Sequence, residues 1–154
     1  MNGDRTGYSV RAYWPAPAGF QEADGLLRGF GFQRDQPAPD RWQTGECLDD
    51  QGFQIAQELR AVAVRHRFAF EVTEEATDFD MGRRYSYLPD QDALHTTTVG
   101  NDRNDYLLVR QVWDAIDQTT TREELVQALE GESGRHIERG LAAWRDPRDP
   151  PATP

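Results

Sequence analysis

The pattern of apolar and polar positions predicts two strands and a short helix in the first third of the chain. Residues 8–14 alternate apolar and polar side chains, which is the period of a half-buried strand. A short helix with Leu26 and Leu27 inward is expected over residues 20–28, and residues 42–48 predict a second strand. Residues 29–32 are a weaker strand candidate because glycine occupies alternate positions, and residues 33–40, which contain Pro37 and Pro39, predict a loop.

The middle of the chain predicts a helix followed by a β-meander. Asp49 or Asp50 is suited to cap a helix that runs to about His66. Its apolar residues recur on one face: Ile55, Leu59 and Val62, with Ala56 and Ala63 beside them. Three strands with short antiparallel connections are expected to follow, over residues 68–73, 83–88 and 94–99.

The C-terminal part predicts helices. A helix from Asn101 or Asp102 to Gln118 is expected to bury Tyr106, Val109, Val112, Trp113 and Ile116, although residues 106–112 alone fit a fourth strand equally well. Thr121 and Glu124 form a capping box for the next helix. That helix is expected to bury Leu125, Val126 and Leu129 and to end at Gly131. A last helix over residues 133–144 carries Ile137, Leu141 and Trp144 on one face.

Together these elements predict an α+β fold. The sheet is mainly antiparallel, with a three-stranded meander plus N-terminal strands, and it packs with helices and a C-terminal helical segment. The 154 residues fit one domain, which we place at residues 1–145. Residues 146–154 are rich in proline and predict a flexible tail.

Composition narrows the possible chemistry. All 17 basic residues are arginine, so mechanisms that need a lysine amine, such as Schiff-base formation or phosphate binding by a Walker loop, do not apply in their usual form. The abundance of Arg, Ala, Gly, Asp and Pro is typical of a GC-rich coding sequence and resembles actinobacterial or actinophage proteins in general. We therefore expect an actinobacterial, phage or mobile-element origin.

The net charge of −10 predicts a protein partner with a basic surface and disfavours direct binding to nucleic acid. No stretch approaches the roughly 18 apolar residues of a membrane span, and residues 1–5 lack the layout of a secretion signal. Cys47 is the only cysteine, which favours a reducing cytoplasm. We expect a non-enzymatic cytoplasmic protein that needs no cofactor and no membrane.

Acidic residues are concentrated in the middle of the sequence. Residues 71–117 contain eleven carboxylates and four arginines. If these carboxylates form one continuous negative face, that face imitates nucleic acid and occupies a basic groove, as expected of a regulatory or inhibitor protein. The candidate partner-binding residues are Glu71, Glu74, Glu75, Asp78, Asp80, Asp90, Asp92, Asp102 and Asp105. The alternative interpretation is that these are solvated loop residues of an acidic protein.

Other functions also fit the sequence. Asp78 and Asp80 with His95 fit a small hydrolase assisted by a divalent metal, although no metal site is assigned. Cys47 as a nucleophile needs a nearby imidazole, from His66 or His95, and a lone cysteine is more often a small buried residue. A virion or assembly component is a third possibility.

Overall fold

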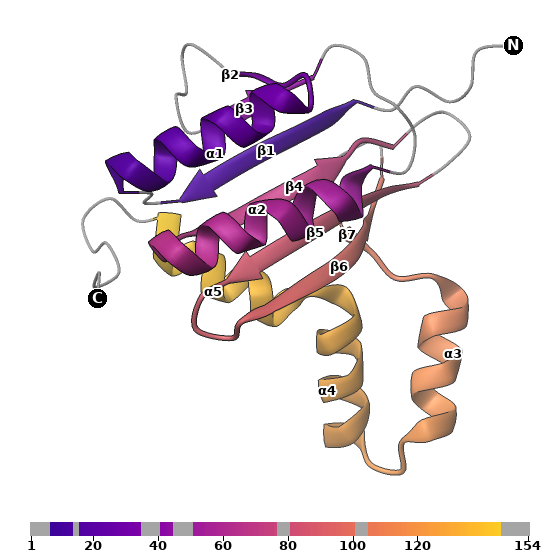
Figure 1. Cartoon of the computed structure of the whole chain (residues 1–154). Coiled ribbons are helices and arrows are strands. Elements are labelled where there is room, and N and C mark those ends of the chain that lie inside the picture. The colour runs from indigo at the N-terminus through magenta and orange to yellow at the C-terminus, as the bar shows by residue number, and fades with distance from the viewer. Residues whose placement is uncertain are drawn as a thin grey trace, which may run out of the picture.

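The computed structural model describes residues 7–13, 16–34, 41–44, 51–76, 81–100 and 105–145. Figure 1 shows the chain with its elements labelled. In chain order these are β1 (Tyr8–Tyr13), α1 (Pro17–Gly29), β2 (Gln33–Arg34), β3 (Arg41–Gln43), α2 (Gly52–His66), β4 (Ala69–Glu74), β5 (Gly82–Leu88), β6 (Ala93–Val99), β7 (Asp105–Tyr106), α3 (Val109–Gln118), α4 (Arg122–Ser133) and α5 (Arg135–Arg145).

The strands form one sheet with the order β2-β3-β1-β4-β5-β6-β7. Every neighbouring pair is antiparallel. The predicted α+β fold and its meander, β4-β5-β6, are confirmed. β1 lies in the interior of the sheet, because Val10 is opposite Trp42 of β3 on one side and Val72 of β4 on the other.

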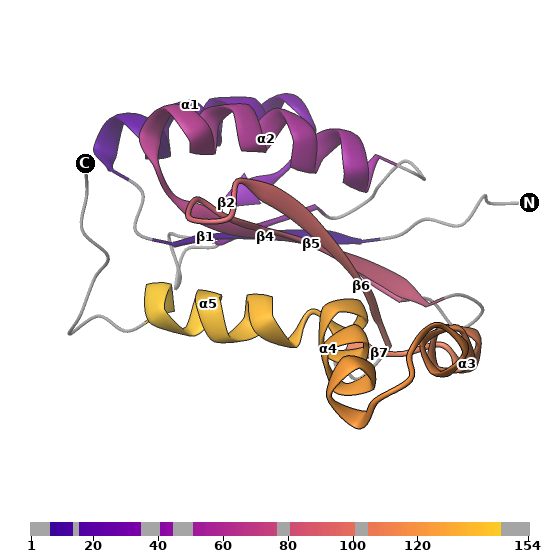
Figure 2. The ribbon, with the colours of Figure 1, turned by 90° about the horizontal axis from the view of Figure 1, so that it is seen from below.

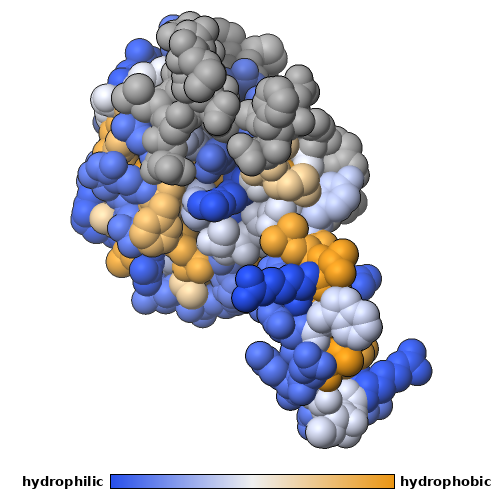
Figure 3. Space-filling model, turned by 90° about the vertical axis from the view of Figure 1, so that its right-hand side faces the viewer, coloured by the Kyte–Doolittle hydropathy of each residue, from blue (hydrophilic) through white to orange (hydrophobic). Residues whose placement is uncertain are grey.

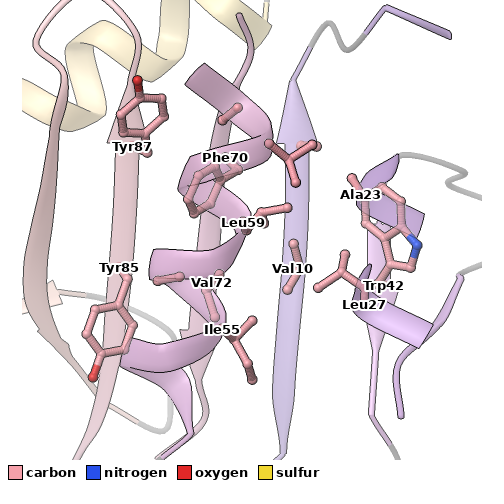
Figure 4. Close-up of a cluster of buried hydrophobic side chains, with 14 of the residues drawn as sticks. Val10, Ala23, Leu27, Trp42, Ile55, Leu59, Phe70, Val72, Tyr85 and Tyr87 are labelled. Carbon is pink, nitrogen blue, oxygen red and sulfur yellow. The ribbon is translucent and has the colours of Figure 1, made fainter. Parts of the chain in front are cut away.

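Helices cover both faces of the sheet. α1 and α2 lie side by side on one face, and α5 lies on the other (Figure 2). The larger core fills the space under α1 and α2, where Ile55 and Leu59 meet Val10, Phe70 and Val72 (Figure 4). The apolar face predicted for residues 55–63 is therefore confirmed.

A second, smaller core lies under α5. Ile137, Leu141 and Trp144 pack there against Tyr13, Ala69 and Leu88. The predicted apolar face of the last helix is therefore confirmed. The alternation predicted for the first strand is confirmed at residues 8–12. Tyr13 departs from it: Ala12 and Tyr13 are both buried, because Ala12 faces the larger core and Tyr13 the smaller one.

Several predicted boundaries are wrong for local reasons. α1 begins at Pro17 and not near residue 20, because proline is well accommodated in the first helical turn. Residues 29–32 form no strand, since Phe30 and Gly31 close the C-terminal turn of α1, and β2 follows within the predicted loop. The N-cap of α2 is Gln51, while Asp49 and Asp50 lie outside the described residues, as do residues 45–48 of the predicted second strand.

The Thr121 cap of α4 is confirmed: the Glu124 backbone N–H donates to Thr121 Oγ1 at 3.1 Å. The Glu124 carboxylate reaches back as predicted, but the N–H that donates to it at 3.0 Å is that of Thr120, one residue before the cap. Hydrogen bonds to this carboxylate, from the Thr120 N–H foremost and then from the Thr120 hydroxyl and the Thr121 N–H, lower the pKa of Glu124. The predicted stop at Gly131 is wrong. α4 continues to Ser133 and ends at Gly134, whose φ of 68° is the left-handed conformation that favours glycine.

Candidate interaction surface

The described acidic candidates do not share a surface. Glu71 is buried on the face of the sheet that α5 covers, where its Oε2 accepts a hydrogen bond from the Tyr13 hydroxyl. Glu74 and Glu75 lie at the far end of β4, close to Gly52 and Gly7 respectively. Glu71 is therefore a structural residue in this fold, and the prediction that it contacts a partner is inconsistent with its burial.

Asp90 and Asp92 lie at the opposite end of the sheet, in the β5–β6 hairpin. Asp90 pairs with Arg67 at 2.8 Å and Asp92 pairs with Arg60 at 3.2 Å, so both charges are matched by guanidinium groups. Burial, followed by the neighbouring Asp92 carboxylate, raises the pKa of Tyr87. The described acids thus lie at two ends of the sheet and in its interior, and they form no continuous negative face.

The remaining predicted site residues are not brought together by the described part of the structure. Asp78, Asp80 and Asp102 lie outside the described residues, as does Cys47, and Asp105 is placed only by its backbone pairing with Val99. Among the residues that the structure describes, no group of three or more His, Cys, Asp or Glu side chains is arranged to hold a metal ion.

His95 lies in a polar row that crosses the sheet. The register aligns Arg11, Glu71, Ser86 and His95 on four successive strands. His95 and Glu71 therefore lie on the same row two strands apart, with Ser86 between them, and their backbones are about 9.5 Å apart at the usual strand spacing.

The His66 side chain contacts a carboxylate of the neighbouring helix. Its Nε2 lies 2.6 Å from Glu22 Oε2, and Arg65 pairs with the other oxygen of the same carboxylate. These contacts join the C-terminal end of α2 to α1. The same two helices approach so closely that a Cβ at Gly19 would lie 2.7 Å from the Cβ of His66. The described contacts of His66 therefore hold the two helices together.

The feature that sequence analysis missed is the exposed apolar side of α3. Val109 is 72% exposed, Trp113 61%, Leu108 50% and Ile116 41%. With the half-buried Val112 they form what we call the α3 apolar face: Leu108, Val109, Val112, Trp113 and Ile116. The prediction that this helix buries its apolar residues is wrong. Figure 3 shows apolar side chains gathered along the part that projects from the body of the molecule.

The orientation of α3 explains why this face is open. α3 packs on α4 through another side, where Ala115 is buried and Gln111 is half-buried. Gln111 Oε1 accepts from the Leu108 N–H at 2.8 Å, and its Nε2 donates to Glu132 Oε2 of α4 at 3.0 Å. Ala115 lies roughly 100° around the helix from Ile116. The side that contacts α4 and the apolar stripe are therefore different sides of one helix.

α4 supports this arrangement but buries little itself. It has no fully buried residue, and Val126 is exposed, which corrects the prediction that Val126 points inward. α4 in turn packs against α5 and β6. The pair α3–α4 therefore forms a helical hairpin that stands away from the sheet (Figure 1).

The hairpin is negatively charged. Residues 109–133 contain two arginines and six carboxylates, a formal charge of −4. Arg110 lies 4.0 Å from Asp114 in an i,i+4 pair on α3. Asp117 follows Trp113 by one helical turn, which places a carboxylate beside the α3 apolar face. The α3 apolar face thus has one carboxylate beside it and belongs to a hairpin of net negative charge.

Comparison with known families gives one match. A family model described as "Protein of unknown function (DUF3145)" matches residues 34–152, which is most of the chain. The chain belongs to the DUF3145 family. Neither curated proteins nor solved structures give a match.

The DUF3145 match includes the whole hairpin and α5 but begins within β2. β1 and α1 precede it, although β1 lies between β3 and β4 in the sheet. The start of the match is therefore not a structural boundary. Within the described residues, no helix combines the length and the apolar character needed to cross a membrane.

Proposed function

We propose that this chain is a non-enzymatic binding protein that contacts a basic partner protein through the α3 apolar face. The observation that carries the proposal is the 61% exposure of Trp113 within a helical stripe of apolar residues. Tryptophan is among the residues that contribute most to binding energy in protein interfaces. A cytoplasmic location accords with the single cysteine.

The pattern of the stripe supports binding over simple surface exposure. Single exposed apolar residues are common, whereas contiguous exposed apolar patches usually mark interaction sites. Val109, Val112, Trp113 and Ile116 recur at i, i+3, i+4 and i+7, the spacing with which one helix presents a continuous face to a partner. Covering these side chains removes apolar surface from water, which is the main favourable contribution to most protein association.

The basic partner is supported by the net charge of −10 and by the −4 charge of the hairpin. We do not retain the idea of a nucleic-acid mimic, because the described acids of residues 71–92 lie at opposite ends of the sheet. Nor does any described contact favour the metal-assisted hydrolase.

Photo-cross-linking tests the proposal. A benzophenone amino acid replaces Trp113 in one variant and Val64 of α2, which is 56% exposed, in a matched control. In cells that naturally express the chain, we expect a discrete adduct from position 113 that is absent from position 64. A Val109→Asp substitution in the same chain should remove the adduct. Identical adducts from both positions, or none from position 113, contradict the proposal.

A further inference from the structure

We infer that the occupant of the α3 apolar face is an amphipathic helix of a partner protein, with apolar side chains on one side and lysine or arginine flanking them. This inference rests on the proposed function and specifies the chemistry of its partner.

The size of the face matches one helix. α3 has ten residues and is therefore about 15 Å long. A standard stable interface uses about 20 to 30 residues on each side, whereas the α3 apolar face offers five. Five side chains in a helical stripe fit the recognition mode in which a partner helix supplies anchors at i, i+3, i+4 and i+7.

The negative charge of the α3–α4 hairpin favours a partner helix with basic side chains. Asp117 lies on α3 one turn after Trp113, and Glu123 lies in the first turn of α4. Cations on the flanks of an incoming helix complement these carboxylates and increase the rate of encounter. A second copy of this chain brings the same −4 hairpin and a total charge of −10, so repulsion opposes self-association through this face.

The ends of the chain itself lack suitable side chains. Residues 1–6 and 146–154 together contain a single large apolar residue, Met1. A matching face needs several apolar anchors at helical spacing. Neither of these two segments has the composition to cover the α3 apolar face.

A titration with synthetic peptides tests the inference on the full-length chain. The probes are two helical peptides of about 18 residues with the same leucine stripe, one with lysine and one with glutamate at the remaining positions. We expect the lysine peptide to bind about tenfold or more tightly than the glutamate peptide at low salt, with the difference narrowing as ionic strength rises.

Two variants separate specific docking from general attraction between opposite charges. Val109→Asp adds a negative charge to the α3 apolar face, and Val64→Asp adds the same charge to α2. The lysine peptide should bind the Val64→Asp variant as it binds the wild type. It should bind the Val109→Asp variant about tenfold or more weakly, despite the added charge.

Four outcomes overturn the inference: equal binding of the two peptides, equal effects of the two variants, no binding at about 1 mM peptide, or a wild-type dimer in sedimentation that Val109→Asp abolishes. If no peptide binds, or if the two variants have equal effects, while the position-113 adduct persists, the helix assignment fails and the proposed function stands. Equal binding of the two peptides, or the dimer, also contradicts the basic partner of the proposed function. If the adduct itself is absent, the proposed function fails.

Discussion

The indole Nε1–H of Trp42 donates a hydrogen bond to Asp24 Oδ1 at 2.9 Å and thereby joins β3 to α1. The other carboxylate oxygen of Asp24 accepts from Arg28 Nε at 2.8 Å. Trp42 is fully buried, so its indole N–H has no water to bond with and depends on Asp24. Burial raises the pKa of Asp24, but the hydrogen bonds from Trp42 and Arg28 outweigh it, and the net pKa is lowered from 3.8.

Asp24→Asn should therefore destabilise the fold in a pH-dependent way. Because the folded-state pKa lies below the unfolded value, the carboxylate contributes stability above pH 3.8, and that contribution is lost as pH falls through the folded-state pKa. Urea unfolding from pH 7 to pH 3 should show a gap between wild type and variant that narrows in acid. A gap that is constant or that widens in acid contradicts this account.

Gly134 and Gly131 should respond in opposite directions to alanine. Gly134→Ala places a side chain in the left-handed conformation, which costs about 1 to 2 kcal/mol, and the new Cβ would overlap Thr97 Cγ2. Gly131 lies inside α4 with open space around it, so Gly131→Ala should stabilise by roughly 0.5 to 1 kcal/mol. Thermal unfolding of both variants is the measurement, and a Gly134→Ala variant as stable as wild type would refute the assigned end of α4.

Trp113 and Trp144 should differ sharply when each is replaced by alanine. Trp144 is buried under the sheet with Ile137 and Leu141, so Trp144→Ala should lower the free energy of unfolding by about 3 to 5 kcal/mol. Trp113→Ala removes an exposed side chain and should change it by less than about 0.5 kcal/mol. Chemical denaturation measures both, and similar losses would mean that α3 buries its apolar face after all.

The first 33 residues should be indispensable for folding, although the family match begins after them. Their removal deletes β1, which pairs with β3 on one side and β4 on the other, and deletes α1 from the larger core. We expect chain 34–154 to show no cooperative thermal transition. Chain 1–145 is the control and should keep a wild-type transition, as the predicted domain boundary requires. A folded 34–154 fragment would show that β1 is an accessory strand.

Substitutions of acids in the β5–β6 hairpin and on α3 should have different effects on the affinity for the lysine peptide. Asp90→Asn and Asp92→Asn break exposed ion pairs with Arg67 and Arg60, which are worth at most about 1 kcal/mol of stability. They lie in the β5–β6 hairpin and should leave peptide binding unchanged. Asp117→Asn, one turn from Trp113, should weaken binding at low salt. If Asp90→Asn and Asp92→Asn weaken peptide binding and Asp117→Asn does not, the peptide binds at the β5–β6 hairpin and not on α3.

The sequence predicted correctly those features that depend on residues close together along the chain. The Thr121–Glu124 box predicted the start of α4, and the spacing of Ile55, Leu59 and Val62 predicted the buried side of α2. Hydrogen bonds within one turn and the helical period are properties of a few consecutive residues. For the same reason the three meander strands were predicted from alternation and short connections.

The sequence alone determined an α+β chain with an antiparallel meander and with amphipathic segments at 109–116 and 137–144. Only the tertiary structure decided that the second of these is buried and the first is exposed, because burial depends on a second surface from elsewhere in the chain. α5 finds Tyr13, Ala69 and Leu88 on the sheet, whereas α3 meets α4 through Ala115 and Gln111. The acids were likewise concentrated in sequence but separated in space, since antiparallel strands carry successive loops to opposite ends of a sheet.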